Sequence, residues 1–89
     1  MQVSAELSLY PLTADYEPAI IDFIQRLRAQ PGIRVATNPL STQLTGDYDA
    51  VMAALTVAMR PTMEAEHSCS LVIKLLNVAI EPGMEVNVG

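Results

Sequence analysis

The stretch VSAELSL, residues 3–9, alternates apolar and polar side chains without interruption. Its apolar members all fall on one side of an extended chain: Val3, Ala5, Leu7 and Leu9. A period of two is typical of a strand with one face on a core. The sequence therefore opens with a predicted strand, which Pro11 ends.

An amphipathic helix is predicted after this strand. Thr13 to Asp15 offers capping oxygens, and Pro18 is tolerated in a first helical turn. Apolar side chains then recur at spacings of four and three, in a stripe with two flanking positions: Ile20, Ile24 and Leu27, flanked by Ile21 and Phe23. The pair Pro31-Gly32 cannot continue a helix, so we expect it to end near Gln30.

Residues 33–45 are predicted to form two short strands around Asn38-Pro39. Asp47 is a good cap for a second helix from about Tyr48 to Met59 or slightly beyond, which Pro61 limits or kinks. A last strand is expected over residues 68–77, with Cys69, Leu71, Ile73 and Leu75 on its helix-facing side. Residues 85–88 either add a short strand or hang loose.

The order strand, helix, strand, strand, helix, strand predicts an α+β fold, the ferredoxin-like βαββαβ plait. Short connections and right-handed crossovers favour a four-stranded antiparallel sheet with both helices on one face. We expect residues 1–80 to form this domain and residues 81–89 to form a C-terminal tail.

Composition excludes several classes of protein. The 89 residues are enough for one domain, and a net charge of −5 argues against a nucleic-acid surface. No apolar run approaches the roughly 20 residues of a membrane span, and the N-terminus lacks the pattern of a secretory signal. One Cys and one His cannot close a zinc shell, so no metal and no cofactor are expected. Cys69 has no partner cysteine, which favours a reducing compartment, the cytoplasm.

Self-association is expected on two grounds. Apolar residues make up 51% of the chain, more than the core of so small a domain can bury. Residues 50–59 of the second predicted helix carry no charge, which indicates burial on more than one side. We therefore expect a homodimer or homotetramer.

Catalytic patterns are lacking, and we expect no enzymatic activity. His67 lies in a polar stretch without a neighbouring nucleophile, and Cys69 shares the parity of a core-facing strand. The outward sheet face is richer in hydroxyl and amide groups than an ordinary solvated face. Such a face suits sheet association or a small polar ligand, and Glu6 is placed to pair with Lys74 across it.

Four segments together resemble the YkoF-like thiamine-binding family. They are SAELSLYPL at residues 4–12, STQLTGD at 41–47, AVMAAL at 50–55 and LVIKL at 71–75, and the likeness covers residues 3 to about 77. The resemblance implies a ferredoxin-like domain that binds thiamine or its hydroxymethylpyrimidine moiety without catalysis. Relatives occur as tandem repeats or as single copies assembled into oligomers.

The resemblance and the chemistry of such a ligand together suggest six ligand-binding residues. An aminopyrimidine offers ring-nitrogen acceptors and an amino donor, which hydroxyl and amide side chains can meet. The expected site comprises Ser8 and Thr42 as hydrogen-bond partners, Asn38 and Gln43 in support, Glu6 as charge partner and Tyr10 stacking on a ring. Thr42 shares the parity of Leu44 and can point to the helices, so the site lies either on the open sheet face or between sheet and helices.

Two other functions compete with this one. A regulatory or scaffolding module would use the outward sheet face only to join another subunit. An acylphosphatase-like hydrolase would need a cation near the first strand, and residues 10–15 contain none.

Overall fold

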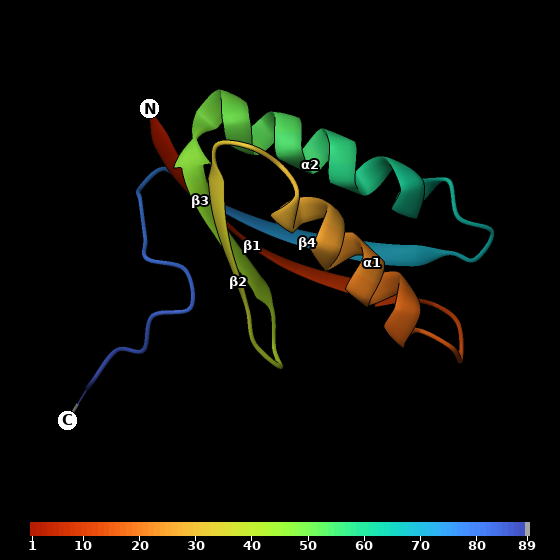
Figure 1. Cartoon of the computed structure of the whole chain (residues 1–89). Coiled ribbons are helices and arrows are strands. Elements are labelled where there is room, and N and C mark those ends of the chain that lie inside the picture. Colours follow the sequence, from red (N-terminus) through yellow and green to blue (C-terminus); the bar gives the residue numbers. More distant parts are fainter. Residues whose placement is uncertain (89) are drawn as a thin grey trace.

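Four antiparallel strands form one sheet, and two helices cover one of its faces, as the computed structural model of the chain shows for residues 1–88 (Figure 1). The strand order is β2-β3-β1-β4. The predicted ferredoxin-like fold is confirmed. In chain order the elements are β1 (Gln2–Pro11), α1 (Glu17–Arg28), β2 (Ile33–Thr37), β3 (Thr42–Asp47), α2 (Tyr48–Met63) and β4 (Cys69–Leu76).

Strand β1 lies at the centre of the sheet and pairs on both sides. Against β3 its register runs from Gln2–Asp47 to Leu7–Thr42, and against β4 from Ser4–Leu76 to Pro11–Cys69. Its alternating apolar residues are all buried under the helices, as the sequence predicts: Val3, Ala5, Leu7 and Leu9. Burial of one face therefore fixes β1 against the helices, and pairing with β1 then positions β3 and β4.

The helices close the core from one side. Helix α1 contributes Phe23 and Leu27, and α2 contributes Val51, Leu55 and Ala58, all buried against β1 and Leu44 of β3. The sequence pattern placed Phe23 beside the apolar stripe of α1, whereas in the structure its side chain lies within the buried core. Ile21, expected beside the same stripe, is half exposed at 50%.

The helix ends differ in how well the sequence predicts them. Asp47 caps α2 as expected, accepting a hydrogen bond from the Asp49 backbone N–H at 3.3 Å. The prediction that Thr13 or Asp15 caps α1 is wrong, because Tyr16 occupies the N-cap position and its side chain makes no capping hydrogen bond. Helix α2 also continues through Pro61 to Met63.

Arg26 of α1 holds the extra turn of α2. Its Nε donates to the Ala58 carbonyl at 3.0 Å and its Nη2 to Thr62 Oγ1 at 2.7 Å. A proline inside a helix removes one backbone hydrogen bond. The two bonds from a neighbouring helix anchor the turn in which that bond is missing, so the helix ends later than the proline alone predicts.

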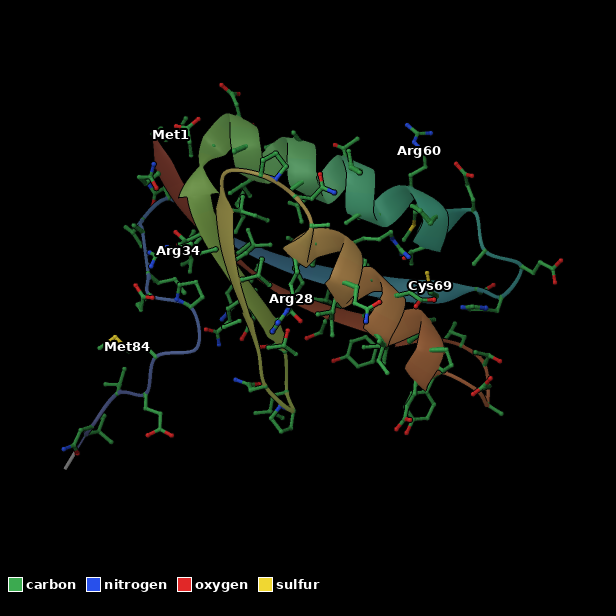
Figure 2. All side chains as sticks on the ribbon, viewed as in Figure 1. Met1, Arg28, Arg34, Arg60, Cys69 and Met84 are labelled. Atoms are coloured by element: carbon green, nitrogen blue, oxygen red, sulfur yellow. The ribbon has the colours of Figure 1, made fainter. Side chains whose placement is uncertain are left out.

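The segment after β4 crosses the open face of the sheet, and residues 77–88 contain no strand (Figure 1). Ser4 of β1 accepts from the Ile80 backbone N–H at 2.9 Å and lies 2.7 Å from the Val78 carbonyl. Gln43 of β3 accepts from the Gly83 backbone N–H at 2.9 Å. Arg34 Nη1 of β2 donates to both carboxylate oxygens of Glu81, at 2.8 and 2.9 Å, and Arg34 lies beside the tail in Figure 2.

Ser4 is the buried anchor of this crossing segment. The Ser4 hydroxyl is fully buried, and its single proton goes to one acceptor at a time, either the nearer Val78 carbonyl or Thr45 Oγ1 at 3.0 Å. Loss of this hydroxyl group leaves the Ile80 N–H and the Val78 carbonyl, both at a part-buried site, without this partner. Each hydrogen bond lost in this way costs about 0.5–1.5 kcal/mol.

Replacement of Ser4 should therefore loosen the tail. We expect Ser4→Ala to lower the free energy of unfolding by about 1–3 kcal/mol and to speed amide hydrogen exchange at Ile80 and Gly83. Ser70→Ala is the control, because Ser70 lies exposed on the same sheet face. Unchanged exchange at Ile80 in Ser4→Ala would contradict this assignment.

Acid should weaken the link between the start of β1 and α2. The ammonium group of Met1 donates to Asp47 at 3.2 Å and lowers the pKa of that carboxyl, with a further lowering by the Asp49 and Tyr48 backbone N–H groups. Because the folded-state pKa lies below the ordinary value of 3.8, the stabilisation is present above 3.8 and is lost as the pH falls through the lower folded-state value.

The variant Asp47→Asn tests this dependence, because asparagine keeps a capping oxygen and removes the charge. We expect wild type to be the more stable protein at neutral pH. The difference in free energy of unfolding should shrink as the pH is lowered in steps below the ordinary pKa of 3.8. A difference independent of pH would contradict the assigned role of the charge.

Candidate binding pocket at the end of the sheet

A pocket of about 510 Å³ lies where β1 extends beyond β3. Pairing between these strands ends at Leu7–Thr42, whereas β1 continues beside β4 to Pro11. The β2–β3 loop and the first turns of α1 surround the space beside this unpaired stretch. The lining residues are 7–12 of β1 and the loop after it, Tyr16, Ile20, Phe23 and Ile24 around α1, and 37–42 of the β2–β3 hairpin. The volume is that of an ordinary small-ligand site.

Two threonine hydroxyl groups face each other in the wall of the pocket. Thr37 Oγ1 and Thr42 Oγ1 are 3.0 Å apart on paired positions of β2 and β3. Thr42 is buried, at 5% exposure, and shares the helix-facing side of β3 with Leu44. Each hydroxyl group can donate and accept, so the pair has further hydrogen-bonding capacity for a ligand.

The backbone of Leu9 is directed towards the same space. The Leu12 N–H donates to the Ser68 carbonyl at 2.8 Å, and the Tyr48 N–H donates to the Met1 carbonyl at 2.9 Å. Because hydrogen-bonding directions alternate along an antiparallel ladder, even-numbered residues of β1 face β4 and odd-numbered ones face β3. Leu9 is odd-numbered and lies beyond the last β1–β3 pair. Its N–H and C=O therefore point to the side where β3 has ended.

Asn38 holds the loop that closes one side of the pocket. Its Oδ1 accepts from the backbone N–H groups of Leu40 and Ser41, at 2.9 and 3.1 Å. This bonding commits the carbonyl oxygen to the turn and leaves the amide NH₂ group as the part of the side chain that can donate to a ligand.

Apolar and aromatic side chains make up the rest of the wall. Phe23 forms part of the buried core, whereas the two tyrosines and two leucines of the lining are more than half exposed: Tyr10, Tyr16, Leu12 and Leu40. Of the described residues that line the pocket, none carries a charge. The pocket therefore suits a flat, uncharged ring with a few polar atoms.

The six residues that the sequence suggested as ligand-binding do not all meet here. Ser8, Tyr10, Asn38 and Thr42 line the pocket, with Thr42 on the helix-facing side of the sheet. Gln43 lies on the open face and bonds the Gly83 N–H of the tail. Glu6 lies on the open face too and pairs with Lys74 at 3.4 Å, as expected. Alternation of side chains along β3 separates Gln43 from Thr42. Glu6 shares a face with Ser8 and Tyr10 and lies outside the pocket because β3 still pairs with β1 at that position.

Ser41 connects Glu6 to the rim of the pocket. The Ser41 hydroxyl group donates to Glu6 Oε2 at 3.1 Å, and Ser41 is itself a lining residue. The Glu6 carboxylate thus lies just outside the pocket, with Ser41 between the two. Thr37, Ser41 and Tyr16 were absent from the expected site. The pairing of Thr37 with Thr42 could have been inferred from the hairpin centred on Asn38-Pro39, whereas the approach of Tyr16 depends on how α1 packs.

His67 and Cys69 lie away from this pocket. They line a second hollow of about 500 Å³, together with Arg26, whose guanidinium group already bonds α2. Residues 1–88 contain no cluster of three His, Cys, Asp or Glu side chains placed to hold a metal ion. Over the same residues, no helix combines the length and apolar character needed to cross a membrane.

Residues 2–79 match the model of the YkoF-related family. The chain belongs to this family. The match spans the whole sheet, both helices and the start of the tail. No curated protein sequence shows significant similarity to the chain.

Solved structures of similar fold come from several bacteria. A candidate thiamine biosynthesis/salvage protein of Thermotoga maritima has a TM-score of 0.73 at 15% identity, with 85% of this chain and 83% of that one covered. A Streptococcus pneumoniae protein has a TM-score of 0.66 at 28% identity, with 90% and 89% covered. A Bacillus cereus domain of unknown function has a TM-score of 0.69 at 20% identity, with 99% and 84% covered.

The role of Asn38 as a loop anchor can be tested without a ligand. We expect Asn38→Ala to lower the free energy of unfolding by about 0.5–1.5 kcal/mol per lost hydrogen bond and to speed exchange of the Leu40 and Ser41 amides. Asn38→Asp retains the accepting oxygen and should restore both properties. Equal exchange in all three proteins would show that the loop is held by other contacts.

Proposed function

We propose that this protein binds the aminopyrimidine part of a thiamine-related compound, such as hydroxymethylpyrimidine, in the pocket at the end of the sheet. The observation that carries the proposal is an uncharged pocket with aromatic walls and a pair of threonine hydroxyl groups. Membership of the YkoF-related family supports it, as does the likeness to a candidate thiamine biosynthesis/salvage protein.

Polar groups of the pocket match the edge of an aminopyrimidine. The exocyclic amino group can donate to a threonine hydroxyl or to the Leu9 carbonyl, and a ring nitrogen can accept from the Leu9 N–H or from a hydroxyl. The Asn38 amide is a further donor at the loop side. Phe23 and Tyr16 supply apolar and aromatic surface for the faces of the ring.

The lack of charge in the lining favours the neutral ring over charged parts of larger ligands. Burying a charge without a partner is costly. The thiazolium ring of thiamine would therefore remain at the rim, where Glu6 lies behind Ser41. Phosphate groups would find no cation among the described lining residues, so we propose that phosphorylation of thiamine adds nothing to binding.

Binding without catalysis is the role that we propose for this pocket. Its described lining offers hydroxyl, amide and backbone groups, has Tyr10 and Tyr16 as titratable side chains, and has no His, Asp, Glu, Lys or Cys. General acid–base catalysis relies most often on His and on carboxylate side chains. The proposed role is therefore to hold a ligand for sensing, buffering or transfer.

A second candidate is an assembly module that takes no small molecule. The observation in its favour is the exposed apolar surface of β4, where Val72 and Leu75 are 54% and 48% exposed. Such a module would form an oligomer and give no heat with any thiamine-related compound.

Calorimetry and thermal melting with hydroxymethylpyrimidine, thiamine and thiamine diphosphate test the proposal. At about 100 times its dissociation constant, a ligand adds about 2.7 kcal/mol of stability, a rise of several degrees in Tm for a small domain. We expect a rise with hydroxymethylpyrimidine and thiamine, and none beyond that of thiamine with the diphosphate. No heat and no shift with any of the three would refute the proposed function.

A matched pair of variants then tests the pocket. Thr42→Val keeps the shape of the side chain and removes the hydroxyl group, and we expect it to weaken binding about tenfold, the equivalent of one hydrogen bond. Thr56→Val is the control, because Thr56 lies exposed on α2 and bonds only its own helix at Met52. Equal affinities for the two variants would place the ligand elsewhere.

A further inference from the structure

An ion pair between Glu6 and Lys74 lies beside the rim of the pocket. Lys74 of β4 is the cross-strand partner of Glu6 on β1, and its Nζ lies 3.4 Å from Glu6 Oε1. The other carboxylate oxygen, Oε2, accepts from the Ser41 hydroxyl group at 3.1 Å, and Ser41 lines the pocket. The carboxylate therefore has a lysine on one side and the wall of the pocket on the other.

The wall of the pocket continues along β1 towards this ion pair. Ser8 and Tyr10 line the pocket, and they share the open face with Glu6 because side chains alternate along a strand. Successive side chains on one face of a strand are roughly 6.5 Å apart. A substituent that leaves the pocket past Ser8 or Ser41 therefore comes next to the Glu6 carboxylate.

The charge of Glu6 is already balanced within the chain. The ammonium group of Lys74 is its counter-ion, and Gln43, the partner of Glu6 on β3, is neutral. The side chains of Lys74 and Glu6 are 66% and 41% exposed. Exposed ion pairs contribute little to stability, so a second cation can compete with Lys74 for the carboxylate.

We propose that Lys74 sets how strongly the pocket distinguishes cationic from neutral aminopyrimidine compounds. The inference rests on the proposed function and adds to it a specificity-determining residue outside the pocket. The thiazolium ring of thiamine carries a permanent positive charge, which hydroxymethylpyrimidine lacks. A thiazolium ring at the rim shares the Glu6 carboxylate with the Lys74 ammonium group, so Lys74 lowers the affinity for the cation. The neutral compound is unaffected.

This competition needs no direct contact between Lys74 and the ligand. Charges in 0.1 M salt act on one another over about 10 Å, which exceeds the single step along β1 between Ser8 and Glu6. Salt shortens that range. The influence of Lys74 on thiamine should therefore be largest at low ionic strength and should fade as salt is added.

Four proteins that differ in charge at the ion pair test the proposal: wild type, Lys74→Gln, Glu6→Gln and the double variant. Glutamine at position 6 keeps a carbonyl oxygen for the Ser41 hydroxyl group and removes only the charge. The measurement is calorimetry with thiamine and with hydroxymethylpyrimidine, at low salt and slightly alkaline pH, where an aminopyrimidine ring is uncharged. Thermal melting checks that each variant is folded.

The two single variants should change the binding of thiamine in opposite directions. We expect Lys74→Gln to tighten it about two- to fivefold, the strength of an exposed charge pair, and Glu6→Gln to weaken it by a similar factor. The double variant should return close to the wild-type value. Hydroxymethylpyrimidine should bind all four proteins equally. A distorted pocket would alter the binding of both compounds, so the ratio of their dissociation constants isolates the charge.

The matched controls are Arg60→Gln and Glu64→Gln on α2. These two side chains form an exposed ion pair at 3.7 Å within one helix. Each control changes the net charge of the chain by as much as its counterpart at Lys74 or Glu6, so it measures the effect of net charge alone. Equal ratios in Lys74→Gln and Arg60→Gln would overturn the proposal.

Failure of this inference and failure of the proposed function give different results. If hydroxymethylpyrimidine binds and the ratio is the same in all four proteins, the pocket holds its ligand and Lys74 has no part in specificity. A ratio that moves in the same direction in both single variants would also refute the role of Lys74. If neither compound binds the wild type, the proposed function fails, and the role of Lys74 fails with it.

Discussion

The unequal lengths of β1 and β3 shape most of the molecule. Strand β1 pairs with β4 as far as Pro11, but its pairing with β3 ends at Leu7. Backbone groups of the last residues of β1 therefore lose a neighbour on one side only. The β2–β3 loop and α1 close around that space without filling it. The pocket is thus a consequence of strand register, and its polar groups come from strand ends and backbone.

The two faces of the sheet contact different parts of the chain. The helix-facing side is occupied by the core and, at one end, by the Thr37–Thr42 pair. The open face is partly covered by the tail, which bonds Ser4, Arg34 and Gln43 on three different strands. Two polar side chains of that face, Ser4 and Gln43, therefore hold the tail.

Local patterns in the chain were enough to predict the plait. The alternation at residues 3–9, the apolar stripe of α1, the Asp47 cap and the order of elements each depend on neighbours in sequence, and all are found in the structure. The resemblance of four segments to the YkoF-like family indicated the family to which the chain belongs. Four of the six suggested site residues line one pocket, because β1 and the β2–β3 hairpin meet at one end of the sheet.

Contacts between distant segments decided the rest. Helix α2 passes Pro61 because Arg26 of α1 bonds Ala58 and Thr62 across the helix pair. Gln43 lies outside the pocket because the pleat turns it to the open face, where the tail binds it. Glu6 shares a face with Ser8 but lies further from the end of the sheet, where it pairs with Lys74. The periodicity of a strand predicts which face each residue occupies, since that depends on the strand's own backbone. Periodicity does not predict where a neighbouring strand ends, and the pocket lies where β3 ends.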